Sequence, residues 1–194
     1  MLKNRFFPWV MTLSAFLLSA TAVFPMEPIA EKDFVCRGDG AGRMVWEGKE
    51  YRDCPGGHLP AGGVRPELLA LLNALQARVG AALVLTSGYR CEAHNRYSWA
   101  CLARDGDAAG VSRRSLHRSG AAADFYVEGV RDISKYRTFA EELRRTAAAS
   151  PGKTVWTRVY GAEEVRDPDN RHDYPYIHVH LLGVPRRPLE PASD

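Results

Sequence analysis

The 194-residue sequence has little net charge, and this excludes one class of partner. Its formal charge is +3 at pH 7. Two of the positive charges, Lys3 and Arg5, precede an apolar run at the N-terminus, so a chain that loses this segment keeps only +1. The remaining arginines are scattered singly or in pairs. A nearly neutral protein lacks the basic surface that nucleic acids require, so we expect no nucleic-acid partner.

Residues 1–22 have the pattern of a cleavable export signal. Basic residues come first, an apolar run follows, and Ala20-Thr21-Ala22 fits cleavage after the last of these small residues. The alternative is an uncleaved membrane anchor, which Pro8 and the short apolar core disfavour. No cysteine lies at the cleavage region, so a lipoprotein is not indicated. We therefore expect a periplasmic or extracellular protein that meets the membrane only during export.

Cysteine is scarce, and its spacing argues against a zinc ribbon. The four cysteines are Cys36, Cys54, Cys91 and Cys101, and none of them belongs to a Cys-x-x-Cys pair. An even number of cysteines in an exported chain predicts two disulfides. We favour the pairs Cys36–Cys54 and Cys91–Cys101, because each closes a local loop. Free buried thiols are the alternative.

The remaining sequence predicts a single α+β domain with flanking segments. Residues 23–65 form a Gly/Pro-rich extension, residues 66–183 the folded domain and residues 184–194 a Pro-rich tail. The expected elements are a hairpin that starts near residue 43, helices over 65–80 and 132–150 with Ser134 as an N-cap, and strands over 82–86, 121–127, 154–161 and 176–183. Residues 91–114 are expected to form a polar loop or a partly helical excursion. This order predicts a small, mainly antiparallel sheet flanked by helices.

Two of the expected strands carry side chains that bind metals. Because side chains alternate along a strand, Asp124 faces away from the core and His178 and His180 share one face. Gly120 turns the chain so that His117 can return beside Asp124. Imidazole and carboxylate groups are zinc ligands, and three of them leave a fourth position for water. Each residue also has a simpler explanation, as a surface histidine or an arginine-paired aspartate, but the combination favours a metal.

Three segments resemble the zinc D-Ala-D-Ala metallopeptidases, a group that also holds lysostaphin-type endopeptidases and the hedgehog signalling domain. The stretch SLHRSGAAAD resembles the signature Ser-x-His-x-x-Gly-x-Ala-x-Asp, and TSGYRCEAHN resembles the Ser-Gly-Tyr-Arg segment before it. YIHVHLLG resembles the closing His-x-His strand. The resemblance spans residues 64–183. It implies an antiparallel sheet flanked by helices, with one zinc ion per chain on the sheet face.

The resemblance also implies roles for the matching histidines and aspartate. His117, Asp124 and His180 would be the zinc ligands, and His178 would be the catalytic base. In relatives that end in His-x-Asp the first histidine binds the zinc. Aligned in that way, His178 would be the ligand and His180 would take the other role.

Three further positions match the family pattern near these ligands. Arg90 would be a catalytic and substrate-binding residue that holds a terminal carboxylate or the oxyanion. Its alternative role is an ion pair with Asp105 or Asp107. Tyr89 would line the substrate cleft, and Ser115 would orient a ligand through a hydrogen bond.

These implications together predict an exported zinc metallopeptidase that hydrolyses amide bonds in peptidoglycan stem peptides. It would be a D-Ala-D-Ala carboxypeptidase or a murein endopeptidase, and a monomer. The alternative is a non-catalytic, zinc-containing module of the same fold that binds peptidoglycan or a protein.

Overall fold

The structure is a computed structural model, and it describes residues 26–106, 115–150, 153–164 and 168–183. The expected export signal and the Pro-rich tail lie outside the described residues, as does Asp107. No helix within the described ranges is long and apolar enough to cross a membrane.

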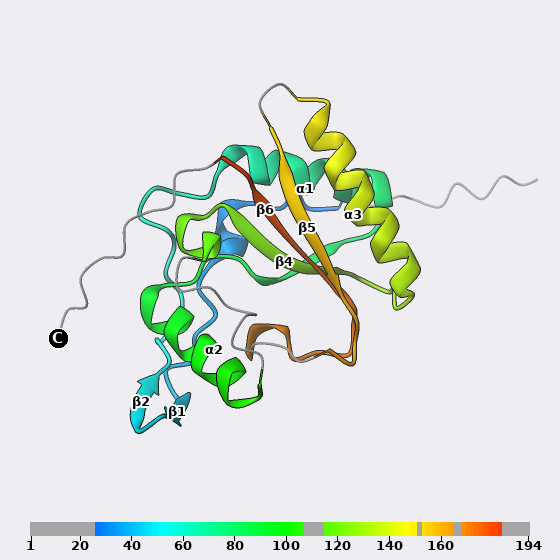
Figure 1. The fold of residues 1–194 in the computed structure, drawn as a ribbon. Coiled ribbons are helices and arrows are strands. Elements are labelled where there is room, and N and C mark those ends of the chain that lie inside the picture. The colour runs from blue at the N-terminus through cyan, green and yellow to red at the C-terminus, as the bar shows by residue number, and fades with distance from the viewer. Residues whose placement is uncertain (1–25, 107–114, 151–152, 165–167, 184–194) are drawn as a thin grey trace, which may run out of the picture.

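The fold is a four-stranded antiparallel sheet with helices and a separate hairpin (Figure 1). In chain order the elements are η1 (Glu31–Phe34), β1 (Arg43–Trp46), β2 (Lys49–Arg52), α1 (Pro66–Val79), β3 (Leu83–Ser87), α2 (Glu92–Arg104), η2 (Leu116–Ser119), β4 (Ala122–Val127), α3 (Ile133–Ala148), β5 (Val155–Tyr160), η3 (Pro168–Asn170) and β6 (Tyr176–Leu181). The sheet order is β3-β4-β6-β5, and β1 pairs with β2. The predicted α+β class and antiparallel sheet are confirmed.

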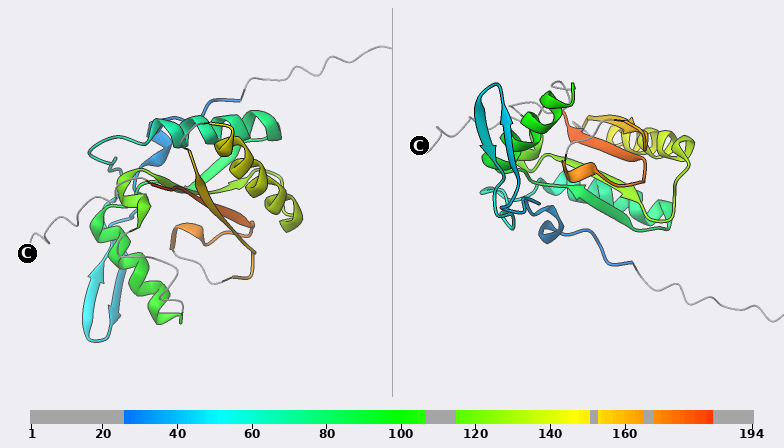
Figure 2. Two further views of the ribbon diagram at one scale, coloured as in Figure 1. Left: turned by 45° about the horizontal axis from the view of Figure 1, so that its top comes forward. Right: turned by 90° about the horizontal axis from the view of Figure 1, so that it is seen from below.

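The two long helices begin and end where local chemistry requires. Pro66 occupies the first turn of α1, and Gly80 ends it in the left-handed conformation at φ 68°. The N-cap of α3 is Asp132 and not Ser134, because the Asp132 carboxylate accepts a hydrogen bond from the Ser134 amide at 2.9 Å. Both helices pack against one face of the sheet (Figure 2).

The two faces of the sheet differ in chemistry because side chains alternate along each strand. Phe125, Ile177 and Val179 are fully buried on the face that α1 and α3 cover. Asp124 and His178 are direct neighbours on the opposite face, since the register pairs these two residues across β4 and β6. The sheet therefore presents its ionisable groups away from the main core.

The described part of the expected excursion, residues 91–106, is mostly the helix α2, so the helical alternative holds for this part. Cys91 caps α2, and Ala100 and Cys101 are buried against Met44 of the hairpin. Partly buried aromatic side chains of both elements complete this second apolar cluster. Burial against the hairpin stabilises a helix whose sequence is otherwise polar.

Part of the expected extension belongs to the main core. Phe34 of η1 is fully buried, and Ile29 is buried in the same cluster. The Tyr89 amide donates a hydrogen bond to the Phe34 carbonyl at 2.7 Å. The segment before residue 66 therefore supports the strand end that carries the Ser-Gly-Tyr-Arg residues.

The four cysteines are free thiols in the structure, which corrects the predicted pair Cys91–Cys101. Cys91 caps α2 and Cys101 lies within the same helix, about 15 Å further along at about 1.5 Å per residue. A disulfide needs Cα atoms within roughly 7 Å of each other. Cys36 and Cys54 do meet, with their sulfur atoms 3.4 Å apart, but as thiols.

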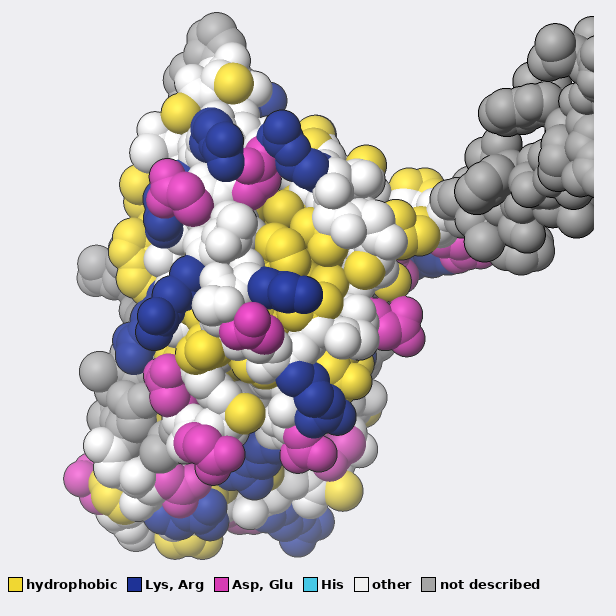
Figure 3. Space-filling model, turned by 90° about the vertical axis from the view of Figure 1, so that its right-hand side faces the viewer, with side chains coloured by type: hydrophobic (Ala, Val, Ile, Leu, Met, Phe, Trp, Pro, Cys, Tyr) yellow, Lys and Arg dark blue, Asp and Glu magenta, His cyan; other side chains and the backbone are white. Residues whose placement is uncertain are grey.

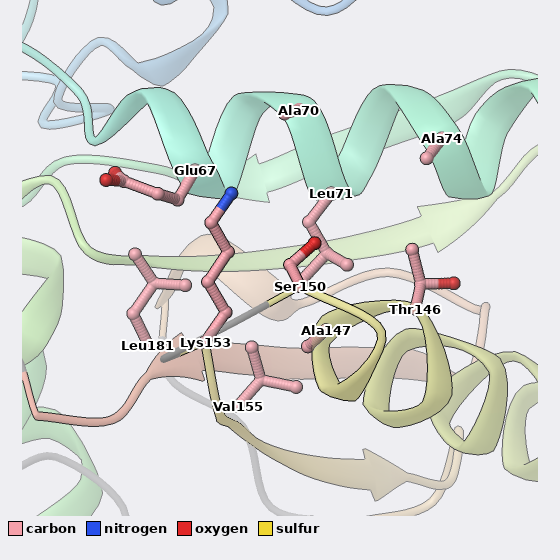
Figure 4. A pocket seen from close by; sticks show the side chains of 10 residues that line it. All are labelled: Glu67, Ala70, Leu71, Ala74, Thr146, Ala147, Ser150, Lys153, Val155 and Leu181. Atoms are coloured by element: carbon pink, nitrogen blue, oxygen red, sulfur yellow. The ribbon is translucent and has the colours of Figure 1, made fainter.

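A pocket lies on the helical side of the molecule, between α1 and the end of α3 (Figure 4). Its lining is mostly apolar, with Glu67 and Lys153 at its edge. Figure 3 shows this side of the molecule, where charged side chains surround apolar ones and none of the described histidines is visible. The ionisable groups of the sheet thus lie elsewhere, on the face opposite the two helices.

Candidate metal centre

Three side chains from separate elements converge on the open face of the sheet. His117 lies on η2, Asp124 on β4 and His178 on β6. One ligand atom of each lies within 4.8 Å of the others. The group contains His117 and Asp124, both ligands expected within the signature, and its third member is His178 rather than His180.

His117 is held with one ring nitrogen turned toward the other two ligands. Its Nδ1 lies 2.7 Å from the carbonyl oxygen of Gly88, which can only accept, so Nδ1 donates. The lone pair is then on Nε2, which lies 3.5 Å from Asp124 Oδ1 and 3.3 Å from His178 Nδ1. Ser115 caps η2 by accepting a hydrogen bond from the His117 amide at 3.4 Å, which fits its expected orienting role.

Asp124 is the charged centre of the group and is only 3% exposed. Its Oδ1 lies 2.6 Å from His178 Nδ1, and its Oδ2 accepts hydrogen bonds from Arg90 and Asn170. Burial raises its pKa, but the nearby His117 and His178 outweigh burial and hold the pKa well below its usual range. Asp124 is therefore a carboxylate, the form that binds metal.

His180 contacts the ring nitrogen of His178 that faces away from Asp124, and it is not a member of the three-residue group. Its Nδ1 is 3.0 Å from His178 Nε2, and its ring stacks on the Trp156 indole at a centroid distance of 5.1 Å. Trp156 also meets His178 edge-on at 5.6 Å and is 42% exposed. His180 and Trp156 thus fix the orientation of His178 and form part of the open surface beside the group.

Arg90 is buried beneath the group, not exposed to a cleft. It is 2% exposed, and its Nη2 donates to Asp124 Oδ2 at 3.3 Å. Its Nε donates to Ser87 Oγ at 2.8 Å and to Asp169 Oδ2 at 3.0 Å. Arg90 forms ion pairs with Asp124 and Asp169, whereas Asp105, the alternative partner expected from sequence, pairs with Arg104 and Arg171. In this structure Arg90 positions Asp124, and Tyr89 beside it is partly buried.

A polar layer on η3 that was not expected from the sequence supports Asp124. Asn170 is fully buried and donates from Nδ2 to Asp124 Oδ2 at 2.8 Å, while its Oδ1 accepts from the Thr86 hydroxyl. Asp169 accepts from Arg90 on one oxygen and contacts His94 Nε2 on the other at 2.7 Å. The only sequence signal was a run of polar turn residues before the last strand.

Two charged groups in this layer have strongly shifted pKa values. Burial raises the pKa of Asp169, but Arg90 and His94 outweigh burial and hold it at about 2. Burial lowers the pKa of His94, but its contacts with Asp169 and Asp53 outweigh burial and raise it to about 9. An alternating row of negative and positive groups therefore runs from Asp124 through Arg90 to these residues.

The donor set of the group fits a zinc ion. Two imidazoles and one ionised carboxylate, each fixed by a second contact, form a common catalytic zinc set with one position left for water. The fixed Nδ1–H of His117 and the low pKa of Asp124 leave ligand atoms with available lone pairs.

Comparisons with known proteins identify the family of this chain. A model of the peptidase M15 family matches residues 49–159, which is more than half of the chain. Among solved structures, the chain is similar to the L-Ala D-Glu endopeptidase ChiX of Serratia marcescens, with a TM-score of 0.41 and 22% sequence identity over 61% of this chain and 80% of that one. No curated protein matches the chain significantly.

Proposed function

Because the chain belongs to the peptidase M15 family, we propose that this peptidase is an exported zinc enzyme that hydrolyses amide bonds in peptidoglycan stem peptides. The observation that carries the proposal is the convergence of His117, Asp124 and His178 on the open sheet face. The three segments that resemble the zinc D-Ala-D-Ala metallopeptidases supply the substrate class.

The proposed ligands are His117 Nε2, an Asp124 oxygen and His178 Nδ1, with one zinc at this centre. This choice takes the second of the two family alignments, because the His178 ring and not the His180 ring lies beside Asp124. A bound zinc ion supplies a Lewis acid that polarises an amide carbonyl and lowers the pKa of a water molecule toward about 7.

The protein's own residues would hold and move the protons of this reaction. With zinc on His178 Nδ1, the remaining His178 proton would lie on Nε2 and could be donated to His180 Nδ1, 3.0 Å away. His180 is partly exposed and is the titratable group next to the ligands, which suits it to exchange a proton with substrate or solvent. Trp156 keeps the His180 ring in place by stacking.

Arg90 supports the reaction indirectly in this proposal. Its buried guanidinium neutralises and positions the Asp124 carboxylate, because it forms ion pairs with both Asp124 and Asp169. It is therefore not the cation that would bind a terminal carboxylate, which a D-Ala-D-Ala carboxypeptidase requires. This favours an endopeptidase acting within or between stem peptides over a carboxypeptidase.

The test is a digest of purified sacculi and of a pentapeptide stem ending in D-Ala-D-Ala, resolved by mass spectrometry. Cleavage within the stem or of cross-linked dimers, abolished by a chelator and restored by zinc, supports the proposed endopeptidase. Release of terminal D-Ala would instead make it a carboxypeptidase. His117→Ala should be inactive, whereas His58→Ala, which changes an exposed histidine, should retain activity.

The second candidate function is a binding module that retains the family fold. We consider it because the hedgehog signalling domain, which belongs to the group that the sequence resembles, holds zinc and serves as a binding protein. Zinc-loaded protein that sediments with sacculi but releases no peptide would favour this candidate and overturn the enzymatic one.

A further inference from the structure

A second cluster of soft ligands lies apart from the histidines of the sheet. Ligand atoms of Cys36, Cys54 and His94 lie within 4.8 Å of one another, and all three residues are buried. The Cys91 thiol interacts with the thiols of both Cys36 and Cys54. Four residues that bind zinc in many proteins therefore meet at the start of α2.

Each sulfur atom in this cluster accepts a backbone N–H. The Cys91 amide points at the Cys36 sulfur at 3.5 Å, the Gly56 amide at the Cys54 sulfur at 3.4 Å and the His94 amide at the Cys91 sulfur at 3.5 Å. Donors aimed at sulfur stabilise the thiolate, which is the form that binds a metal.

The spacing of the sulfur atoms fits a shared metal ion. The sulfur atoms of Cys36 and Cys54 are 3.4 Å apart. Zinc–sulfur bonds of about 2.3 Å in a tetrahedron put neighbouring sulfur atoms roughly 3.8 Å apart, whereas a disulfide bond is about 2.05 Å. The observed separation is closer to the first arrangement.

His94 has the partner that a zinc-bound histidine commonly has. Its Nε2 lies 2.7 Å from Asp169 Oδ1, which can accept an N–H and fix the ring. Its Nδ1 contacts the Asp53 carboxylate at 2.6 Å, so a zinc ion on Nδ1 would replace both the Nδ1 proton and this contact. Cys91 and His94 are separated by two residues in the first turn of α2, a short ligand spacing typical of structural zinc sites.

We propose that Cys36, Cys54, Cys91 and His94 form a structural zinc site distinct from the His117 centre. Four protein ligands close the coordination sphere, so this site would hold the fold and take no part in hydrolysis. Zinc would replace the protons of the three thiols and of His94 Nδ1, and these protons pass to solvent.

The site would join two parts of the chain that are far apart in sequence. Cys36 and Cys54 come from the segment before α1, whereas Cys91 and His94 begin α2 directly after Arg90. A metal bound there would hold the chain in place directly after Arg90, and so would help to position the Arg90 side chain that contacts Asp124. The proposal does not depend on the proposed function, because it concerns other ligands.

The first test counts zinc and free thiols in the purified mature protein. We expect two zinc ions per wild-type chain, one at the His117 centre and one at the cysteine site. His117→Ala should therefore keep one zinc. Cobalt substituted for this remaining metal should give the sulfur-to-cobalt charge-transfer band that a site without thiolates cannot give. Loss of all metal in His117→Ala would overturn the proposal.

Cysteine variants provide the matched comparison. Cys54→Ser and Cys91→Ser should each lose one zinc and the charge-transfer band, while Cys101→Ser, on the same helix but in contact with Tyr97, should keep both. If these variants fail to fold, peptide mapping of the unreduced wild type still decides. A Cys36–Cys54 disulfide there, with no thiolate-bound metal, would contradict the site.

Discussion

At the scale of residues, the site depends on how charges are placed around Asp124. Its carboxylate is buried and meets two histidines on one oxygen and Arg90 and Asn170 on the other. A buried charge is tolerated only when such partners surround it. Changes to the partners should therefore affect stability as well as metal binding.

Replacing Arg90 by Ala should destabilise the protein by about 3–5 kcal/mol, because Asp124 and Asp169 would be left buried without their cation. The measurement is the free energy of unfolding in denaturant. Arg96→Ala is the control, since its pair with Glu92 is exposed and should contribute about 0–1 kcal/mol. An Arg90 variant with normal stability and only a raised KM would restore the substrate-binding role.

The low pKa of Asp169 predicts a loss of stability in acid. Because its pKa in the fold is about 2 against an ordinary 3.8, its contribution is complete above about 3.8 and is lost as the pH falls through 2. That contribution is of the order of 2 kcal/mol. The measurement is the free energy of unfolding between pH 5 and 2, on protein from which a chelator has removed the metal. It should fall less steeply with decreasing pH in Asp169→Asn than in the wild type. Equal slopes in the two proteins would contradict the assignment.

At the scale of elements, the short turn between η2 and β4 brings His117 and Asp124 together. Gly120 has φ 63°, and an added Cβ would lie 2.7 Å from the Gly63 carbonyl oxygen and 3.1 Å from Val64 Cα. These are backbone atoms that cannot move aside cheaply. In the same turn, the Gly120 carbonyl oxygen accepts a hydrogen bond from the Arg65 amide at 3.0 Å.

Gly120→Ala should therefore weaken zinc binding and destabilise the fold beyond the roughly 1 kcal/mol of a positive φ alone. Gly129→Ala is the matched control, because Gly129 has φ 74° with no atom near the added Cβ. Thermal melts and zinc titrations of the two variants make the comparison. Equal effects of the two substitutions would show that the packing around Gly120 is unimportant.

How far the sequence predicts these elements depends on how local their causes are. The apolar face of α1 and the alternation in β4 and β6 arise within each segment, so the helix, the strands and the shared face of His178 and His180 could be read directly. The N-cap of α3 was placed two residues late, because Ser134 and Asp132 are both good caps.

Contacts between distant segments could not be read in the same way. The partners of Arg90 and Asp124 lie on η3, far along the chain, and no local pattern specifies where that turn packs. The choice between His178 and His180 depends on which ring the strand register sets beside Asp124. The Cys91–Cys101 pairing failed because α2, expected only in part, separates the two residues along its axis.

At the scale of the whole molecule, the segment before α1 is part of the folded unit. Phe34 and Ile29 are buried in the main core, and the Arg37 side chain donates to the Leu85 carbonyl at 2.6 Å. The segment also carries Cys36 and Cys54 to the start of α2. A boundary at residue 66 would cut through these contacts.

A chain that starts at Pro66 should therefore fail to fold cooperatively, whereas one that starts at Glu27 should melt as the full mature chain does. Removing Phe34 alone should cost about 3–5 kcal/mol, the usual range for a buried aromatic side chain. Circular dichroism melts of the two truncated chains make the test. A cooperative, zinc-binding fragment from Pro66 would show that the segment is a dispensable extension.

The most direct test of the central claim is the zinc content of His178→Ala and His180→Ala measured beside the wild type. We expect His178→Ala to lose one zinc per chain, because His178 Nδ1 lies beside Asp124, and His180→Ala to keep the wild-type count with slower turnover. Loss of that zinc in His180→Ala and its retention in His178→Ala would contradict the proposed centre of His117, Asp124 and His178.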